Sequence, residues 1–459
     1  MSTAVQLEPR VAPPPAGART RRLVIDLTDD WPNTGRLLPW MLAGFLVMLW
    51  VIPFDAITLP FTLPFQARLD RVILGVIAVI WLGSLAAGGE GTPRLRHTPM
   101  DLGVAAFFAA ALASILINSG TLVNLGEFSM AIKNLALLVS YITFFYVASS
   151  VIRPTEVQAF ITLTIVLACI TALGTIYEYR SDMNVFFAWT AHLLPGAVYV
   201  APDTVGVDSI GRRAVSGPTG HGLAVTTMLA LALPFAINRV MQVEDLWSKL
   251  VYGLAAAIIL GGAAATVRKS AVVVPLVAIT ALVLFQPRDI RKMIPLGIGL
   301  LLMTHVLSPG AMGSIRSQFS AGDDSAPVSG RTEDYKAVAP DLLHGIAIGR
   351  GYGSYDPHRY RYLDNQFLGL RITTGWIGVG AFAVMVLSVL ALAKRRGPKA
   401  LRSPPAVAAA AGAVGFAVAS GLFDVLAFPQ VPYIFFFMAA IAVAASAEQR
   451  SAEPPTAEP

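Results

Sequence analysis

Charge and cysteine are both scarce in this chain. Only 14% of its 459 residues are Asp, Glu, Lys or Arg, and 55% are hydrophobic, whereas a soluble globular protein carries about 25% charged residues. This scarcity excludes an ordinary soluble enzyme and a disordered protein. With a single cysteine, Cys169, the chain can form neither an intramolecular disulfide nor a thiolate metal cluster. The composition predicts a chain whose main solvent is lipid.

Basic residues slightly outnumber acidic ones. The chain has 34 Lys and Arg against 28 Asp and Glu, which gives a formal net charge of +6. In a membrane chain, Lys and Arg first of all set the topology. We therefore do not interpret the basic excess as a sign of a nucleic-acid partner.

Long apolar runs indicate the fold class. A hydrocarbon core of about 30 Å requires roughly 20 apolar residues per helix, and about twelve runs of this order lack interior charge. They cover residues 37–58, 71–88, 101–118, 131–150, 156–177, 220–237, 250–266, 270–285, 293–307, 372–393, 407–423 and 431–447. The run at 293–307 is the weakest, because it is short and contains Pro295 and His305. We predict an all-α integral membrane protein with about twelve transmembrane helices.

The chain divides into two tails and one membrane domain. Residues 1–36 and 448–459 are predicted to be disordered cytoplasmic tails, because their composition cannot bury a core, and residues 37–447 form the transmembrane domain. The first apolar run begins too late to be a cleaved signal peptide, so we interpret it as a signal anchor. A cytoplasmic N-terminus puts the short basic loops on the cytoplasmic side, as the positive-inside rule requires. The strongest of these loops contains Lys394, Arg395, Arg396, Lys399 and Arg402.

Two extracytoplasmic loops are much longer than the other turns. They cover residues 178–219 and 308–371, and loops of this length are usually functional or disordered. The second loop contains aromatic residues and regular glycines, so we expect it to fold against the membrane domain. Polar residues gather on this outer face, where such clusters in membrane proteins are usually functional.

Three polar motifs lie on this face. The first leads into the sixth span and places Arg213 and His221 beside a helix start, where unpaired N–H groups favour an anion. The second is the short turn 266–270, whose Arg268 and Lys269 oppose the local topology preference and therefore suggest an anionic partner. For both motifs the alternative is that the basic side chains meet lipid headgroups.

The third motif lies in the second long loop. It has three parts. The first is the segment 329–335, which contains Arg331. The second is the run Gly349-Arg350-Gly351-Tyr352-Gly353, and the third is the segment Asp364-Asn365-Gln366-Phe367-Leu368. The glycine run is not a nucleotide-binding loop, because no alternation of strands and helices surrounds it. The histidines show no metal-ligand spacing, and no acidic cluster suggests a metal site. We therefore expect chemistry that uses no metal and no cofactor, and in which basic residues alone hold phosphates.

Taken together and in this order, the motifs resemble those of the O-antigen ligase and polymerase superfamily. The matching positions are Arg213 with 216–221, then 267–270, then glycines 349, 351 and 353 followed by 364–368 and 375–378. The resemblance covers roughly residues 178–393. It implies a polytopic glycosyltransferase of the bacterial cytoplasmic membrane that moves a glycan from an undecaprenyl-diphosphate carrier to an acceptor at the outer face. The acceptor is a glycolipid in ligases and the growing glycan in polymerases.

The resemblance also implies roles for individual residues. The diphosphate-binding arginines correspond to Arg213 or Arg212, Arg268 and Arg331, and the positions that orient the acceptor or the loop correspond to Asn365, Gly351 and Gly353. One position departs from the family pattern. Where ligases typically carry a histidine before the asparagine, this chain has Asp364, and His221 is its best-placed imidazole. The departure favours a polymerase, or a ligase that acts on another acceptor.

The residues themselves suggest a mechanism. Guanidinium groups bind phosphate oxygens in a bidentate way and stabilise the charge that develops as a diphosphate leaves. The attacking sugar hydroxyl needs a general base, and either Asp364 or His221 could serve. The expected partners are a polyprenyl-diphosphate-linked glycan, a glycan or glycolipid acceptor and membrane lipids. Two alternatives from other classes are a transporter or flippase of the same lipid-linked saccharide and a structural membrane subunit.

Overall fold

The chain folds as a bundle of helices. A computed structural model describes residues 29–58, 68–89, 92–194, 198–199, 215–287, 297–300, 302–303, 306, 313, 336–340, 342, 345–394 and 403–452. Its α-helices are α1 (Leu37–Val51), α2 (Leu69–Ala87), α3 (Pro99–Ile117), α4 (Ser119–Leu125), α5 (Phe128–Val151), α6 (Val157–Ser181), α7 (Val185–Leu193), α8 (Gly222–Gln242), α9 (Leu246–Ala265), α10 (Ser270–Phe285), α14 (Gln366–Leu392), α15 (Pro404–Ser420) and α16 (Gln430–Ala452).

Short elements connect these helices. The 3₁₀-helices are η1 (Phe54–Ala56), η2 (Pro154–Glu156), η3 (Gly217–Thr219) and η6 (Val425–Ala427). The strands β1 (Ile57–Thr58) and β2 (Val198–Tyr199) are two residues long and pair antiparallel, with Ile57 opposite Tyr199. The architecture of the described residues is therefore helical apart from this one short pair.

Eight helices in the described part of the chain are long and apolar enough to cross a membrane, and three shorter apolar helices accompany them. This confirms the prediction of an all-α membrane protein. The predicted run at 293–307 lies largely outside the described residues, so the count of twelve spans stays a prediction. The predicted tails at 1–28 and 453–459 also lie outside the described residues.

Residues 29–36 differ from the predicted disordered tail. The buried carboxylate of Glu156 in η2 accepts a hydrogen bond from the amide of Trp31 at 2.8 Å and pairs with Arg36. The indole ring of Trp31 stacks on Phe160 with ring centroids 4.6 Å apart. These contacts fix the segment beside η2. The C-terminal boundary differs as well, because α16 continues past the predicted end of the last span to Ala452.

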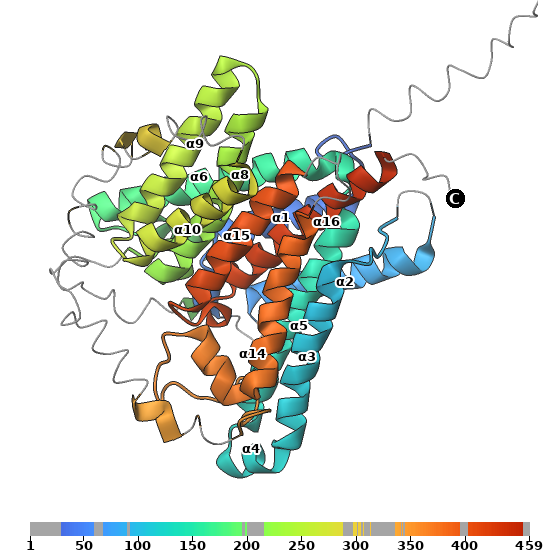
Figure 1. Ribbon diagram of the computed structural model, residues 1–459, viewed down its shortest axis with the longest axis vertical. Helices are drawn as coiled ribbons and strands as arrows, with labels where there is room; N and C mark the ends of the chain where they lie inside the picture. The colour runs from blue at the N-terminus through green and yellow to red at the C-terminus, as the bar shows by residue number, and fades with distance from the viewer. Residues whose placement is uncertain are drawn as a thin grey trace, which may run out of the picture.

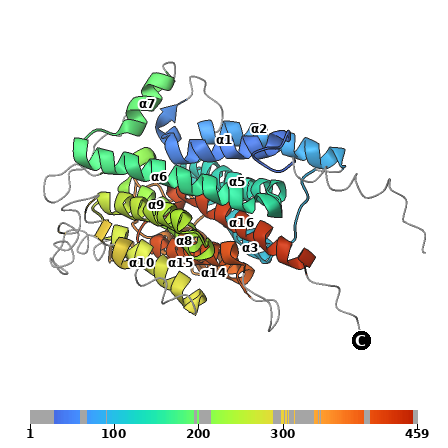
Figure 2. The ribbon, with the colours of Figure 1, turned by 90° about the horizontal axis from the view of Figure 1, so that it is seen from above.

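Helices α8 and α16 form the centre of the bundle. Figure 1 shows α3, α5 and α14 side by side as one column with α4 at its end, and Figure 2 shows α1 and α2 along one edge and α10 along the opposite edge. Close helix packing in lipid depends on small residues. Helix α15 is rich in alanine and packs against α8, α10 and α16. At Gly412 a side chain would meet the carbonyl oxygen of Leu231 at 3.5 Å.

The bundle has two distinct ends. The loop end contains the connections at 118–127, 182–194, 215–221, 266–269, 345–365 and 421–429. The opposite end contains the connections at 29–36, 88–89, 92–98, 152–156, 243–245 and 403. Hydrogen bonds between segments distant in sequence hold each end together, for example from Asn118 to Gly349 at the loop end and from Asn238 to Pro404 at the opposite end.

Helix α14 is interrupted near the loop end. Gly375 has φ +67° and ψ −168°, which breaks the helical backbone inside a predicted span. The segment 346–351 satisfies the backbone groups that the break leaves open. The amides of Trp376 and Ile377 donate to the carbonyls of Ile346 and Ala347, at 3.1 and 3.2 Å, and the carbonyls of Ile372 and Thr373 accept from the amides at 350 and 351. Unpaired backbone groups cost several kcal/mol in lipid, so this exchange is what makes the break possible.

We expect the substitution Gly375→Ala to destabilise the protein. A Cβ atom at this position would overlap the carbonyl group of Ala347, and the positive φ disfavours any L-residue by about 1–2 kcal/mol. Overpacking adds about 1–3 kcal/mol. The free energy of unfolding in detergent should fall by at least about 2 kcal/mol. Gly380→Ala is the matched control, because Gly380 lies in the same helix with open space around it; an equal loss in both variants would contradict the prediction.

Candidate functional site

Buried charge gathers at the loop end. Five charged side chains in the described residues are buried, namely Asp70, Glu127, Glu156, Glu178 and Arg371. All except Glu156 lie at or near the loop end. Ionisable groups inside a membrane protein are costly, and they usually mark functional positions. The buried charges therefore make the loop end the candidate location of a functional site.

Glu178, near the end of α6, holds the first motif in place. Its carboxylate accepts hydrogen bonds from the amide and the hydroxyl of Ser216, at 3.1 and 3.2 Å, and from the amide of Gly217 at 2.9 Å. The backbone then turns through η3 and the left-handed Gly220. This turn brings His221 to the N-cap position of α8, where its side chain makes no capping hydrogen bond.

His221 and Arg268 meet at the start of α8. A Cβ atom on Gly222, the first residue of α8, would lie 3.5 Å from Nε of Arg268, so the guanidinium group crosses the helix entrance. The ring of His221 stacks on Phe428 with centroids 4.7 Å apart. Burial, together with the positive charge of Arg268, lowers the pKa of His221 to about 4. The imidazole is therefore neutral at pH 7, and its buried Nδ1 has no hydrogen-bond partner among the described residues.

The turn that carries Arg268 has a strained backbone. Val267 has φ +53°, a conformation that β-branched residues rarely adopt. The turn is anchored below by the hydroxyl of Thr266, which lies 2.8 Å from the hydroxyl of Thr226 in α8. Backbone strain persists where surrounding contacts fix it, and such positions cluster at ligand sites. The uncapped helix start and the guanidinium group of Arg268 beside it together form a favourable place for an anion.

The glycine run of the third motif packs against α4 and α5. The side chain of Asn134 in α5 donates to the carbonyl of Gly353 at 2.7 Å, and a Cβ atom at Gly353 would overlap this side chain. At Gly351 a Cβ atom would lie 2.8 Å from Leu122 of α4. Arg350 pairs with the buried Glu127 at 2.7 Å. The glycines therefore let the backbone approach two helices closely.

Asn365 caps α14. Its side-chain oxygen accepts from the amides of Phe367 and Leu368, at 2.9 and 3.2 Å, as an N-cap residue does. Asp364, the residue before it, is exposed. Asp364 and Asn365 therefore lie at the point where the second long loop enters the bundle.

The connection around η6 joins the two regions. At one end, Gln366 of α14 accepts a hydrogen bond from the amide of Leu426 at 2.9 Å. At the other end, Phe428 stacks on His221. The hydroxyl of Tyr141 donates to the carbonyl of Leu426 at 3.2 Å and supports the connection from below. The start of α14 and the start of α8 thus face each other across one short segment.

A cavity of about 180 Å³ lies beside this connection. Its polar lining comes from Asn134, Tyr352, Arg361, Gln366 and Asp424, and Leu363 lines it next to Asp364. Burial raises the pKa of Asp424 to about 6, although the amides of Leu426 and Ala427 lower it. A carboxylate with this pKa can accept a proton near neutral pH.

The structure brings some predicted site residues together and does not describe others. His221 and Arg268 are neighbours, and Asn365, Gly351 and Gly353 position the long loop and the start of α14. Three predicted diphosphate-binding arginines, Arg212, Arg213 and Arg331, lie outside the described residues. Their roles stay predictions.

Sequence reasoning missed Asp424 and Glu178. Asp424 is the one acidic residue in the short connection between the last two predicted spans, on the side where the other motifs lie. A lone acidic residue in this position could have indicated a functional side chain. Glu178 begins the first long loop in the prediction, but the structure places it inside α6 with 2% exposure.

Comparisons with known proteins add no family assignment. No protein-family model matches this chain, and no curated protein matches it.

We expect Glu178→Gln to loosen the entrance to α8. The substitution removes a charged acceptor of three hydrogen bonds, and hydrogen bonds to charged groups contribute about 1.5–3 kcal/mol each. The midpoint of thermal unfolding in detergent should fall. Glu244→Gln, which neutralises an exposed glutamate in the α8–α9 connection, should leave it unchanged. An unchanged midpoint in both variants would show that Glu178 does not stabilise this loop.

Proposed function

We propose that the protein is a glycosyltransferase of the O-antigen ligase or polymerase type. It would transfer a glycan from an undecaprenyl-diphosphate carrier to a sugar hydroxyl at the outer face of the bacterial cytoplasmic membrane, in the synthesis of a surface polysaccharide. The observation that carries the proposal is the meeting of Arg268 and a neutral His221 at the uncapped start of α8. The resemblance of the three motifs supports the same reaction.

The donor side of the proposed reaction uses Arg268. The bond between the anomeric carbon and the diphosphate breaks, and the diphosphate leaves on the polyprenol with increased negative charge. A guanidinium group held against free helix amides can stabilise this charge without rearrangement. In the proposal Arg212 or Arg213 and Arg331 complete the clamp. The diphosphate bond itself supplies the driving force, so neither ATP nor a nucleotide sugar is required.

The acceptor side requires a proton acceptor. The sugar oxygen forms the new bond to the anomeric carbon, and its proton passes to a base. His221 and Asp364 are the bases proposed from the sequence, and Asp424 joins them because it lies in the cavity under the long loop. The pKa values of His221 and Asp424, about 4 and about 6, make the candidates distinguishable by experiment.

A transporter or flippase of the same lipid-linked saccharide is the alternative. Transporters place charged groups and interrupted helices near the middle of the membrane. In the described residues, the buried charges lie at or near the helix ends and four of the five are at the loop end. This distribution favours the enzyme. A structural subunit is less consistent with the polar cavity beneath the loop.

A single assay separates these functions. The purified protein is incubated with a polyprenyl-diphosphate oligosaccharide alone. A ladder of longer products indicates a polymerase, whereas product that forms only after a second acceptor is added indicates a ligase. Movement of the saccharide across a vesicle membrane with no new glycosidic bond would favour the transporter.

Substitution of Arg268 tests the proposed clamp. Arg268→Ala should abolish transfer, and Arg268→Lys should reduce kcat by about 10²-fold or more, because lysine keeps the charge but loses the bidentate geometry. Transfer is measured by product formation from the lipid-linked donor. Lys269→Gln, in the adjacent position, is the control for loss of charge in the same turn. Full activity of Arg268→Ala, or loss of activity on chelation of divalent metal, would contradict the clamp.

The pH dependence of transfer tests the base. A base acts when it is deprotonated, so activity should rise with pH through the pKa of the responsible group. Half-maximal activity near pH 6, together with loss of activity in Asp424→Asn, would identify Asp424. A profile that stays flat down to about pH 4, together with loss of activity in His221→Gln, would identify His221. Activity that survives in both Asp424→Asn and His221→Gln leaves Asp364 as the base among the three candidates.

A further inference from the structure

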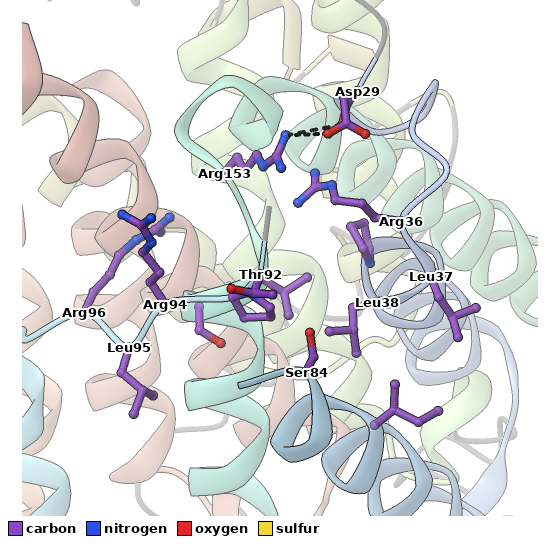
Figure 3. A pocket seen from close by; sticks show the side chains of 15 residues that line it. Asp29, Arg36, Leu37, Leu38, Ser84, Thr92, Arg94, Leu95, Arg96 and Arg153 are labelled. Carbon is purple, nitrogen blue, oxygen red and sulfur yellow. Dashed lines mark hydrogen bonds and ion pairs between the residues drawn. The ribbon is translucent and has the colours of Figure 1, made fainter. Parts of the chain in front are cut away.

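A second cavity lies at the opposite end of the bundle, far along the helices from the site proposed above. It has a volume of about 760 Å³ and is open on one side. It is bordered by the start of α1, the last turns of α2, the end of α5 and the segment 92–96. Four arginines line it: Arg36, Arg94, Arg96 and Arg153. Figure 3 shows Arg94 and Arg96 together on one side of the cavity and Arg36 and Arg153 on the other.

Three of these arginines are fixed by the protein. Arg36 pairs with the buried Glu156, and Arg153 lies 3.3 Å from Asp29 and 3.5 Å from Asp30. Nη1 of Arg96 donates to the carbonyls at 149 and 152, where α5 ends, at 2.9 and 3.0 Å. Their guanidinium groups are therefore positioned before any ligand binds.

Arg94 is different. Its side chain is exposed and forms no hydrogen bond or ion pair with any residue in the described part of the chain. Asp29, Asp30 and Glu156 pair with two of the four arginines, and of these carboxylates only Asp29 lines the cavity, so the cavity has an excess of positive charge. Arg36, at the N-cap of α1, makes no side-chain capping hydrogen bond, and the free amides of that helix start add a partial positive charge. The cavity is suited to an anion that would pair with Arg94.

The remaining walls are apolar. Leu38, Ile80 and Val151 line the cavity from α1, α2 and α5, and Leu37 and Leu95 are 59% and 60% exposed at its mouth. A small soluble anion would gain no binding energy from apolar walls, whereas an anion with an apolar tail would. Snorkelling arginines reach the headgroup layer separately, whereas these four line one cavity from several segments.

We propose that this cavity binds an anionic phospholipid, with the phosphate held by Arg94 and its neighbouring arginines and the acyl chains lying along the apolar mouth. The ligand class is therefore a phosphate ester that carries a net negative charge and an apolar tail. This binding does not depend on the glycosyltransferase function.

Native mass spectrometry of the detergent-solubilised protein tests the proposal. The protein is titrated with phosphatidylglycerol or with phosphatidylcholine, and the fraction that retains lipid is measured. Phosphatidylglycerol should be retained more strongly than phosphatidylcholine. Arg94→Gln should weaken retention of phosphatidylglycerol about tenfold, since a hydrogen bond to a charged group is lost. Arg94→Lys should recover part of the loss.

Lys249→Gln is the matched control, because Lys249 is an exposed cation at the same end of the bundle and outside the cavity. It should retain phosphatidylglycerol like the unmodified protein. Equal retention of the two lipids, or an equal loss in Lys249→Gln, would overturn the proposal. So would displacement of the lipid by millimolar inorganic phosphate, because that result would identify a site for free phosphate.

Discussion

The exchange of backbone hydrogen bonds between the segment 346–351 and the interrupted helix α14 is the constraint on which the loop end depends. The break at Gly375 leaves amides and carbonyls without helical partners, and the long loop supplies them. The segment 346–351 is therefore bound to α14 by backbone hydrogen bonds inside the membrane domain. Side-chain hydrogen bonds from Asn118 and Asn134 to the carbonyls of Gly349 and Gly353 hold the same part of the loop beside α3 and α5. The loop and the break therefore require each other, and together they place Asn365 and the cavity beneath the loop.

The two ends of the bundle use charge differently. At the loop end, buried carboxylates hold the connecting segments in place: Glu178 accepts hydrogen bonds from the backbone at the entrance to α8, and Glu127 pairs with Arg350. At the opposite end, carboxylates such as Glu156 pair directly with arginines around a wide cavity. The loop end has a small polar cavity of about 180 Å³, and the opposite end has a larger cavity, of about 760 Å³, with an excess of cations. The same residue types therefore produce two chemically distinct sites.

Hydropathy was sufficient to predict the fold class, because each span is an apolar run close to the thickness of the membrane. It could not predict the break at Gly375, since a glycine within an apolar run resembles a glycine at any helix contact. The sequence motifs placed His221 and Arg268 in separate loops, and only the packing of α8 against α9 and α10 makes them neighbours. The composition of residues 29–36 predicts disorder, but the structure shows them in a defined conformation. Their contacts come from Glu156, which is distant in the sequence, and not from their own composition.

The position of α16 in the chain has a consequence for biogenesis. It is the last of the described helices and also among the most deeply buried, packed against α5, α8 and α15. Helices are synthesised in chain order, so α5, α8 and α15 are made before the helix that covers their inner surfaces. Those surfaces are apolar and can contact lipid until α16 packs against them. Packing of α16 therefore exchanges lipid for protein at the centre of the described helices.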